Sequence, residues 1–421
     1  MQRRAVFTGA GLICPSGLDL ASFWNALIEG RSAVRRLRHF DPSPLPVHIG
    51  AEVDDFDVKN YVDKKERKRL GPAARGFQFM VAASQLAVAD AKINKEALDP
   101  TRFGVYLGSS TLPGELAELG PAAQATTDIG AAKVDFRKWG AAGLELIPPM
   151  WMLNHIPNIM TCHVSILHNA QGASNTITQT DVAPLLAVGE ALRAVSRGKG
   201  DVMLVGGADN QSIPVNMVRH VKFAGLSRRN DEPEKACRPF DRDRDGSVQA
   251  EGAGCLVLEE ADYARKRGAP IYAEVAGFAS GVDVRRDGKG LARVIRIALE
   301  QAGIKPSDLD HVNAQGNGTK TEDRWEAAGI RAGLDGAPVP VVALKGYFGN
   351  MGAGGGAVEL AATLLALKHG QVPATLNCEH PDVECPIDVA QAVRPLTKRH
   401  ALKISLTELG QCAALVVRRP D

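Results

Sequence analysis

Short apolar stretches alternate with helical patterns along almost the whole chain, and this alternation constrains the fold more than any other feature. Residues 175–209, NTITQTDVAPLLAVGEALRAVSRGKGDVMLVGGAD, show it in one unit: a strand, a sharp turn, a helix and a second strand. Further strands are predicted at 4–13, 102–110, 252–260, 270–279 and 412–419, and helices at 77–91, 290–303 and 357–370. Such alternation is typical of α/β proteins, with mostly parallel sheets and helices on both faces.

The chain length of 421 residues allows one large α/β unit built from two similar halves. The alternation of strands and helices starts again after residues 258–270. We therefore expect an N-terminal half at residues 1–258, which contains the sharp turn, and a C-terminal half at residues 259–421, each built from βαβ units.

A single acidic residue, Asp181, stands at the turn between the strand and the helix of residues 175–209. A strand-to-helix elbow is a place where folds of this class present a nucleophile. Aspartate is also a favoured helix N-cap, because its carboxylate accepts a hydrogen bond from an N–H of the first turn. From the residues alone, Asp181 is either a functional carboxylate or a cap of the helix that follows.

Charge and hydropathy exclude several classes of partner. The formal net charge is +2, which does not indicate nucleic acid as a partner. No window approaches eighteen uninterrupted apolar residues, and the start MQRRAVFTGAG lacks the apolar stretch of a signal peptide. The seven cysteines are scattered along the chain, which favours reduced thiols in a cytoplasmic protein.

Two motifs could hold a metal, and neither fits. Residues 241–252, DRDRDGSVQAEG, nearly match a calcium loop, but the last ligand position holds Gly252 and Glu251 comes one place early. A second group consists of Cys378, His380 and Cys385. Its spacing does not fit a zinc knuckle. We predict no metal and no other cofactor.

A basic run occupies residues 59–71, KNYVDKKERKRLG. Such a run is usually a solvated helix face, but it can also dock an acidic partner. The candidate docking residues are Lys64, Lys65, Arg67, Lys68 and Arg69.

Eight motifs in a fixed order resemble one family. They are VFTGAGLICPSG, DVMLVGGAD, LSRRND, RPFDRDRDGSVQAEGAGCLVLEE, RGAPIYAEVAGF, VNAQGNGTKTED, LKGYFGNMGAGGGAVE and LTELGQCAALVV. Together they resemble the β-ketoacyl synthases, the decarboxylating condensing enzymes of fatty-acid and polyketide assembly. The resemblance covers nearly the whole chain and implies a thiolase-like fold, in which two similar halves form a layered α-β-α-β-α arrangement.

The resemblance places the family's catalytic residues at positions where this chain has others. The cysteine of the family's T-A-C triplet, which takes an acyl chain from a carrier protein, corresponds to Asp181. The first histidine, in V-N-A-H-G-T, corresponds to Gln315. Lys345 is kept, but the second histidine, five residues further on, corresponds to Asn350. In the glycine-rich gating segment, the gating phenylalanine corresponds to Glu408, which follows Thr407.

These replacements remove the groups that condensation needs. A carboxylate is a poor nucleophile towards a thioester, whereas a thiolate at a helix start forms a labile thioester. The amides of Gln315 and Asn350 can still donate hydrogen bonds to an enolate, but neither can become an imidazolium. Ordinary Claisen condensation is therefore not expected.

Three functions remain open. One is a silent ketosynthase-like subunit, comparable to the chain-length factors that pair with an active ketosynthase in type II polyketide systems. The second is an enzyme with altered acyl-thioester chemistry, hydrolysis or acyl transfer, that uses Asp181, Lys345 and Glu408. The non-catalytic alternative for the same residues is a buried Asp181–Lys345 ion pair that fills an inactive site. The third is a module that binds an acyl group or an acyl carrier protein.

The expected partners are an acyl carrier protein and a second subunit, as a homodimer or as a heterodimer with an active ketosynthase.

The segment at residues 112–150 is longer than the family pattern implies. We expect it to lie over the pocket or at a dimer interface.

Overall fold

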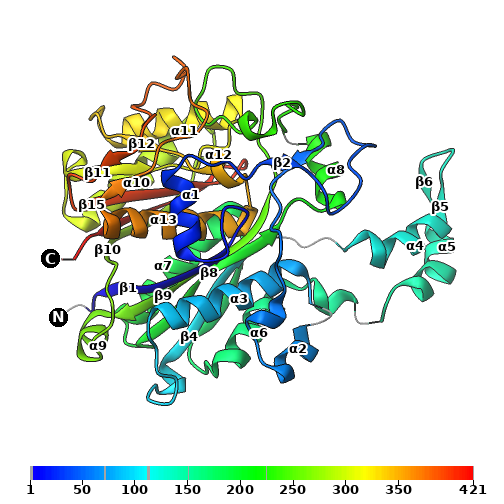
Figure 1. Ribbon diagram of the computed structural model, residues 1–421, viewed down its shortest axis with the longest axis horizontal. Coiled ribbons are helices and arrows are strands. Elements are labelled where there is room, and N and C mark those ends of the chain that lie inside the picture. The colour runs from blue at the N-terminus through cyan, green and yellow to red at the C-terminus, as the bar shows by residue number, and fades with distance from the viewer. Residues whose placement is uncertain (1–2, 71–72, 111–113, 150, 224, 421) are drawn as a thin grey trace.

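One large mixed sheet organises the computed structural model, which describes residues 3–70, 73–110, 114–149, 151–223 and 225–420 (Figure 1). The strands of its first half, from the outer edge inwards, are β7 (Ser174–Thr178), β4 (Phe103–Ser109), β8 (Val202–Asn210), β9 (Glu251–Glu260) and β1 (Ala5–Ile13). Those of its second half are β10 (Ala273–Val282), β16 (Gln411–Arg418), β15 (His400–Leu406), β11 (Leu309–Asn313) and β12 (Val341–Val342). The halves meet where β1 pairs with β10.

Parallel pairing, expected for most of the sheet, occurs towards its two ends. There β4 lies parallel to β7 and β8, and β11 lies parallel to β12 and β15. From β8 through β9, β1, β10 and β16 to β15 the strands pair antiparallel. The pairing of β15 with β16 has a simple cause, because a connection of only a few residues can form a hairpin but cannot form a parallel crossover.

Two helices lie between the half-sheets, and others cover the outer faces. The central helices α7 (Ala183–Ser196) and α13 (Gly355–His369) contact strands of both halves. The outer helices are α3 (Arg75–Asp90) and α6 (Pro157–His168) on the first half, and α10 (Lys289–Ala302) on the second, where α11 (Lys320–Gly333) packs against it. Almost every residue of α13 is buried, as expected for a helix with sheet on both sides. This is the predicted layered, thiolase-like α/β fold.

The division into halves at residue 258 stays a prediction. Ten strands divide evenly around the β1–β10 pairing, but β9 continues to Glu260. Shorter elements complete the chain: α1 (Leu20–Ile28), α2 (Lys64–Leu70), α8 (Pro214–Phe223), α9 (Ala261–Lys266), α12 (Lys345–Phe348), β2 (Arg35–Arg36), β3 (Ile49–Gly50), β13 (Gln371–Val372) and β14 (Arg394–Pro395). Among the described residues, no helix combines the length and apolar character needed to cross a membrane.

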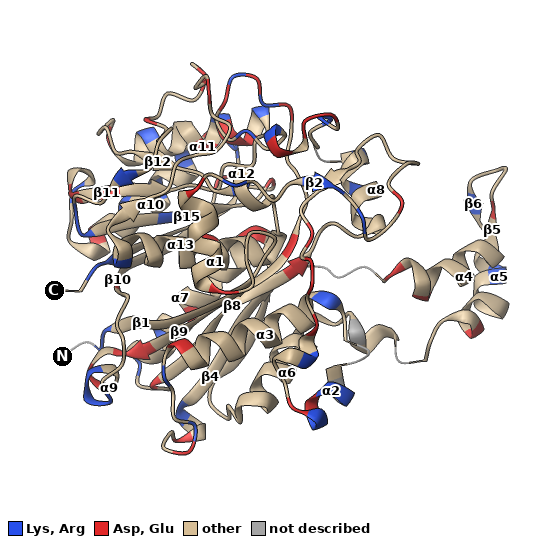
Figure 2. Cartoon of the chain, in the orientation of Figure 1, with Lys and Arg blue, Asp and Glu red and all other residues tan. Residues whose placement is uncertain are grey.

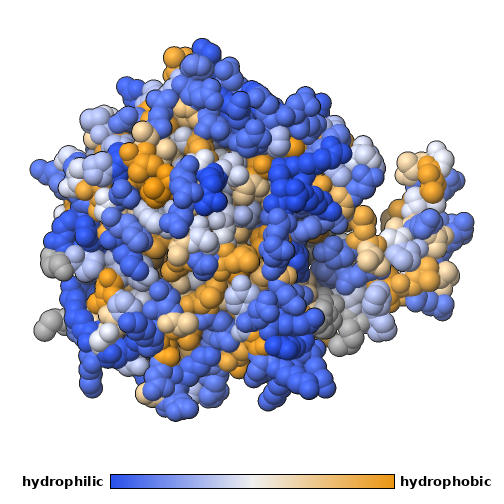
Figure 3. All heavy atoms as spheres, in the orientation of Figure 1, coloured by the Kyte–Doolittle hydropathy of each residue, from blue (hydrophilic) through white to orange (hydrophobic). Residues whose placement is uncertain are grey.

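The long segment forms an arm that extends away from the body of the molecule (Figure 1). It contains α4 (Leu116–Thr126), β5 (Thr127–Asp128), β6 (Lys133–Val134) and α5 (Phe136–Lys138), followed by short helical turns. Large apolar side chains are exposed on it, with Ile129 79% and Phe136 82% accessible. Figure 3 shows apolar atoms gathered along this arm. The arm therefore leaves uncovered an apolar surface that soluble monomers rarely keep.

Candidate functional site

The elbow predicted at Asp181 is present. Strand β7 ends at Thr178, a single helical turn covers Thr180–Val182, and α7 begins at Ala183. Thr180 has a φ of 47°, a left-handed conformation that costs free energy for a β-branched residue. Asp181 lies inside the short turn, and α7 has no side-chain cap. The interpretation of Asp181 as a helix cap is therefore wrong.

The carboxylate of Asp181 instead meets the two amides that stand at the family's histidine positions. Gln315 Nε2 donates a hydrogen bond to Asp181 Oδ1 at 2.9 Å. The side chain of Asn350 also interacts with the carboxylate and favours its charged form. Gln315 follows β11 and Asn350 follows α12, so three segments far apart in the sequence converge here. Burial dominates the electrostatics and raises the pKa of Asp181, although the Lys345 charge opposes this effect.

Lys345 does not form its ion pair with Asp181. Lys345 Nζ lies 2.5 Å from Glu359 Oε1, and Lys403 Nζ lies 2.7 Å from the other oxygen of that carboxylate. All three side chains are almost fully buried. Lys403 also donates to the carbonyl of Ile404 at 2.5 Å. The alternative of an Asp181–Lys345 pair is therefore wrong, because Glu359 on α13 binds two ammonium groups.

A second buried carboxylate holds Gln315 in place. Glu326 on α11 accepts hydrogen bonds from the backbone N–H groups of Gln315, at 2.7 Å, and Gly316, at 2.9 Å. Burial raises the pKa of Glu326 to about 7. Sequence reasoning missed Glu326, Glu359 and Lys403. A signal was available for Glu359 and Lys403, because each interrupts an otherwise apolar helix or strand pattern.

A polar cavity of about 470 Å³ reaches Asp181. It opens to solvent, since Phe223 on its wall is 82% exposed. Asn350 and Glu408 line it as well, while the described lining does not include Gln315 or Lys345. The structure thus brings Asp181, Asn350 and Glu408 to one cavity and leaves the lysine behind its wall.

The two predicted gate residues differ in their exposure. Thr407 is 5% exposed, and its N–H donates to the carbonyl of Gln411 at 2.9 Å in the turn between β15 and β16. Glu408 is exposed on that turn, and its carbonyl accepts from Arg286 at 3.2 Å. Only Glu408 of the two lines the cavity among the described residues. Their role as a gate stays a prediction.

Glu322 is a further carboxylate on the cavity wall. Burial raises its pKa to about 7, and the neighbouring Asp323 and Asp181 charges act in the same direction. Asn317 Nδ2 donates to Glu322 Oε2 at 2.8 Å, and Asn350 Nδ2 donates to Asn317 Oδ1 at 3.2 Å. The cavity wall therefore carries two carboxyl groups with raised pKa values, connected through asparagine amides.

Glu322→Gln is expected to change how stability depends on pH. The raised pKa means that the folded chain holds this proton more tightly than the unfolded chain, so the stabilisation is full below about pH 4.5 and is lost as the pH rises through about 7. The variant should therefore gain up to about 3 kcal/mol relative to the parent between these pH values. Urea denaturation at about pH 5 and about pH 8 measures this. The exposed control Glu384→Gln should not change the free energy of unfolding at either pH. If Glu322→Gln lost as much stability between about pH 5 and about pH 8 as the parent does, the assignment to Glu322 would be contradicted.

The predicted docking residues lie on α2. Lys64, Lys65, Arg67 and Lys68 are exposed, and the side chain of Arg69 lies outside the described part of the structure. Figure 2 shows α2 with its basic positions in blue, and α2 contributes no described residue to the cavity. The cluster remains a docking prediction.

Comparisons with known proteins agree with this geometry. The family model described as "Beta-ketoacyl synthase, N-terminal domain" matches residues 2–264. The model described as "Beta-ketoacyl synthase, C-terminal domain" matches residues 272–379. The chain is 35% identical to 3-oxoacyl-[acyl-carrier-protein] synthase 2 of Synechocystis over 92% of this chain and 91% of that protein. It is 32% identical to the synthase of the same name from Vibrio cholerae, over 98% of this chain and 95% of that protein.

Solved structures show the same relationship over the full length of both chains. The ishigamide ketosynthase/chain length factor superposes with a TM-score of 0.88 at 28% identity. A type II polyketide synthase acyl-carrier protein in complex with its ketosynthase bound to the hexaketide gives 0.86 at 27% identity. In both cases 100% of this chain and 100% of the other chain are covered.

Proposed function

The chain belongs to the β-ketoacyl synthase family, and on this premise we propose that it is a non-condensing ketosynthase-like subunit of polyketide- or fatty-acid-type synthesis. One observation carries the proposal. Asp181 accepts a hydrogen bond from Gln315 and interacts with Asn350, so its carboxylate brings the three replaced positions into a single cluster. The cluster contains neither a thiol nor an imidazole, which the family's reaction requires.

No other described thiol can replace the missing nucleophile at this cavity. Cys237 lies close enough to feel the Lys345 charge, but burial raises its pKa to about 12 and keeps it protonated. The one exposed cysteine among the described residues, Cys162, lies on α6 and is not part of the cavity lining. Nucleophilic catalysis needs an accessible thiolate, so these thiols do not restore the reaction.

Two surfaces support pairing with a second subunit. Strand β7 forms one edge of the sheet and has exposed or half-exposed residues, so its free backbone groups can pair with another strand. The apolar arm extends away from the body and needs a surface to cover it. We propose that both belong to an interface with an active ketosynthase. The similarity to the ishigamide ketosynthase/chain length factor supports this pairing.

Co-expression tests the pairing directly. We expect the chain to purify as a one-to-one complex with a T-A-C-containing ketosynthase, as measured by native mass spectrometry. Phe136→Glu on the arm should weaken the complex at least about tenfold, because a charge would be buried in an apolar contact. Val383, which is 91% exposed elsewhere, provides the control Val383→Glu. A stable homodimer that does not exchange with the ketosynthase would contradict the proposal.

The basic cluster on α2 is proposed to dock an acyl carrier protein. One of the similar solved structures is an acyl-carrier protein in complex with its ketosynthase, and a lysine cluster attracts an acidic surface. The substitution Lys64→Glu combined with Lys68→Glu should lower carrier affinity at least about tenfold at low salt. Surface plasmon resonance with immobilised carrier protein measures the loss. The control, Lys266→Glu combined with Lys289→Glu, changes two exposed lysines elsewhere and alters the net charge by the same amount. Equal losses in both variants would show that only net charge matters.

A second candidate function is acid–base chemistry on an acyl thioester, which the open cavity and the raised pKa of Asp181 favour. Lys345 would take no direct part, because it is bound to Glu359 behind the cavity wall. Thioester hydrolysis by the parent protein that disappears in Asp181→Asn would support this function. It would also count against a silent subunit.

A further inference from the structure

A basic pocket of about 650 Å³ lies at the opposite end of α13 from the candidate site. Gly356, near the start of this helix, lies beside the backbone of Asp181, while Leu367 and Lys368 at its end line the pocket. The helical rise over these twelve residues places the two sites about 18 Å apart. This pocket is therefore separate from the cavity at Asp181.

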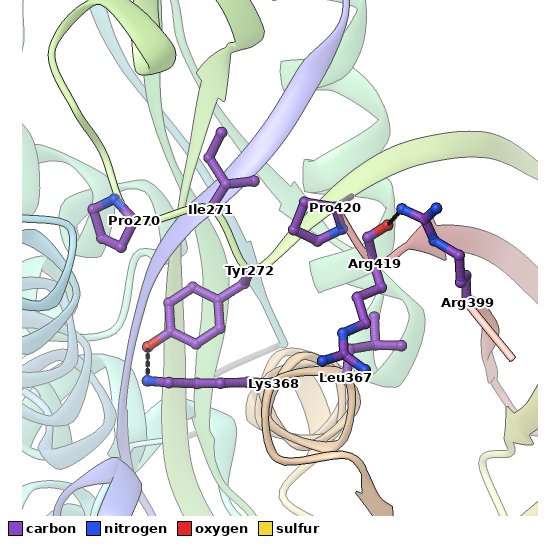
Figure 4. A pocket seen from close by; sticks show the side chains of 8 residues that line it. All are labelled: Pro270, Ile271, Tyr272, Leu367, Lys368, Arg399, Arg419 and Pro420. Carbon is purple, nitrogen blue, oxygen red and sulfur yellow. Dashed lines mark hydrogen bonds between the residues drawn. The ribbon is translucent and has the colours of Figure 1, made fainter. Parts of the chain in front are cut away.

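Side chains from several segments far apart in the sequence line the pocket (Figure 4). They are Pro270, Ile271, Tyr272, Leu367, Lys368, Arg399, Arg419 and Pro420. Of these described residues, three are cations, none is a carboxylate, and the remainder are apolar or aromatic. Figure 4 shows the Arg419 side chain extending along Leu367 towards the end of α13. A pocket with an apolar floor and a one-sided charge fits an anion that carries an apolar body.

Two of the cations, Lys368 and Arg419, retain donors for a ligand. Lys368 Nζ donates to Tyr272 Oη at 3.2 Å, which leaves two ammonium hydrogens. Among the described residues, the Arg419 guanidinium has no hydrogen-bond or ion-pair partner, although its backbone carbonyl accepts from Arg399 at 2.9 Å. A guanidinium presents paired donors that match a phosphate geometrically.

The carboxylate that bonds to Tyr272 is already engaged. Asp90 accepts hydrogen bonds from Tyr272 Oη at 2.9 Å and from the N–H of Ala10 at 2.9 Å, and it is not part of the pocket lining. Burial raises the pKa of Tyr272 above its ordinary value, so the phenol stays neutral. Among the described lining residues, no acid therefore compensates the positive charge of Lys368 and Arg419.

We propose that this pocket binds a small phosphate monoester with an apolar or aromatic body. Arg419 and Lys368 bind the phosphate, and Ile271, Leu367 and the prolines contact the apolar body. The dianionic charge of a phosphate monoester matches two cations better than a carboxylate does. The proposed site is independent of the chemistry at Asp181.

Calorimetric titration of the full chain tests the proposal with phenyl phosphate as the probe. We expect a one-to-one complex with a Kd below about 1 mM, and binding of inorganic phosphate or phenol at least about tenfold weaker. Arg419→Ala and Lys368→Ala should each weaken phenyl phosphate at least about tenfold. Both side chains are exposed, so neither variant should unfold the chain. Lys59→Ala, an exposed lysine elsewhere, is the control.

Two outcomes would overturn the proposal: no phenyl phosphate binding at millimolar concentration, or binding that Arg419→Ala and Lys368→Ala leave unchanged. Adenosine 5′-monophosphate and dodecyl phosphate then distinguish a nucleotide-like body from a lipid-like one. The tighter binder of the two identifies the source of the ligand.

Discussion

Glu359→Ala is expected to lower the free energy of unfolding by about 3–5 kcal/mol, the largest stability effect of any single substitution considered for this site. Glu359 is fully buried and binds both Lys345 and Lys403, which are buried as well. Removing the carboxylate leaves two ammonium groups in a low-dielectric interior, where an unpaired charge costs several kcal/mol. Urea denaturation measures the loss. If Glu359→Ala does not fold at all, the loss exceeds the whole free energy of unfolding of the parent.

A matched variant separates charge from packing. Replacing the whole cluster, Lys345→Met with Glu359→Leu and Lys403→Met, keeps the volume and removes every charge, so most of the stability should return. The exposed Glu384→Ala should change the free energy of unfolding by less than about 0.5 kcal/mol. If Glu359→Ala were as stable as the parent, the paired lysines would have to be neutral in the folded protein.

Asp181→Cys is expected to create a reactive thiol where the parent has none. The cavity gives reagents access to this position, and Lys345 together with the start of α7 favours the thiolate. In a Cys162→Ser background, iodoacetamide should label the variant stoichiometrically and leave the buried cysteines unmodified. Mass spectrometry of the peptide identifies the labelled residue. An unlabelled Cys at this position would show that the cavity does not admit small molecules to the elbow.

Condensation should require all three positions. With Asp181→Cys alone, the amides of Gln315 and Asn350 cannot supply an imidazolium, so decarboxylation should stay at the level of the parent. Adding Gln315→His and Asn350→His should raise the decarboxylation of a malonyl thioester at least about 100-fold, since one acid–base group typically contributes that much. A triple variant no faster than the parent would show that further residues of the cavity, such as Glu408, also block the reaction.

Most of the fold was accessible from the sequence. The alternation of apolar strands with helical patterns predicts the α/β class, and the ordered motifs predict the layered thiolase-like arrangement that the structure has. The antiparallel centre of the sheet was not predicted, because strand patterns report which residues are buried and not the direction of the neighbouring strand. The arm was recognised as an unusually long segment, but its length does not say that it extends away from the body.

The residues of the candidate site were also only partly predictable from the sequence. Spacing relative to the family motifs identified Asp181, Gln315, Lys345 and Asn350 as positions of interest. It did not identify the partner of Lys345, because Glu359 lies fourteen residues away on another helix and its pairing depends on how α12 and α13 pack. The charges of Glu359 and Lys403 interrupt apolar patterns, but this signal does not say which partner each one binds, and Glu326 has no such signal.

By itself the sequence determined the class of fold, the family and the identity of the residue at the elbow, because these follow from local periodicity and from motifs read in order. Only the tertiary structure decided that Asp181 bonds to Gln315 and not to Lys345, that Glu359 binds two lysines, and that a cavity reaches the elbow. Each of these depends on distances between segments more than a hundred residues apart or on the packing of neighbouring elements. Such distances are set by the packing of helices between two half-sheets, and no local pattern records them.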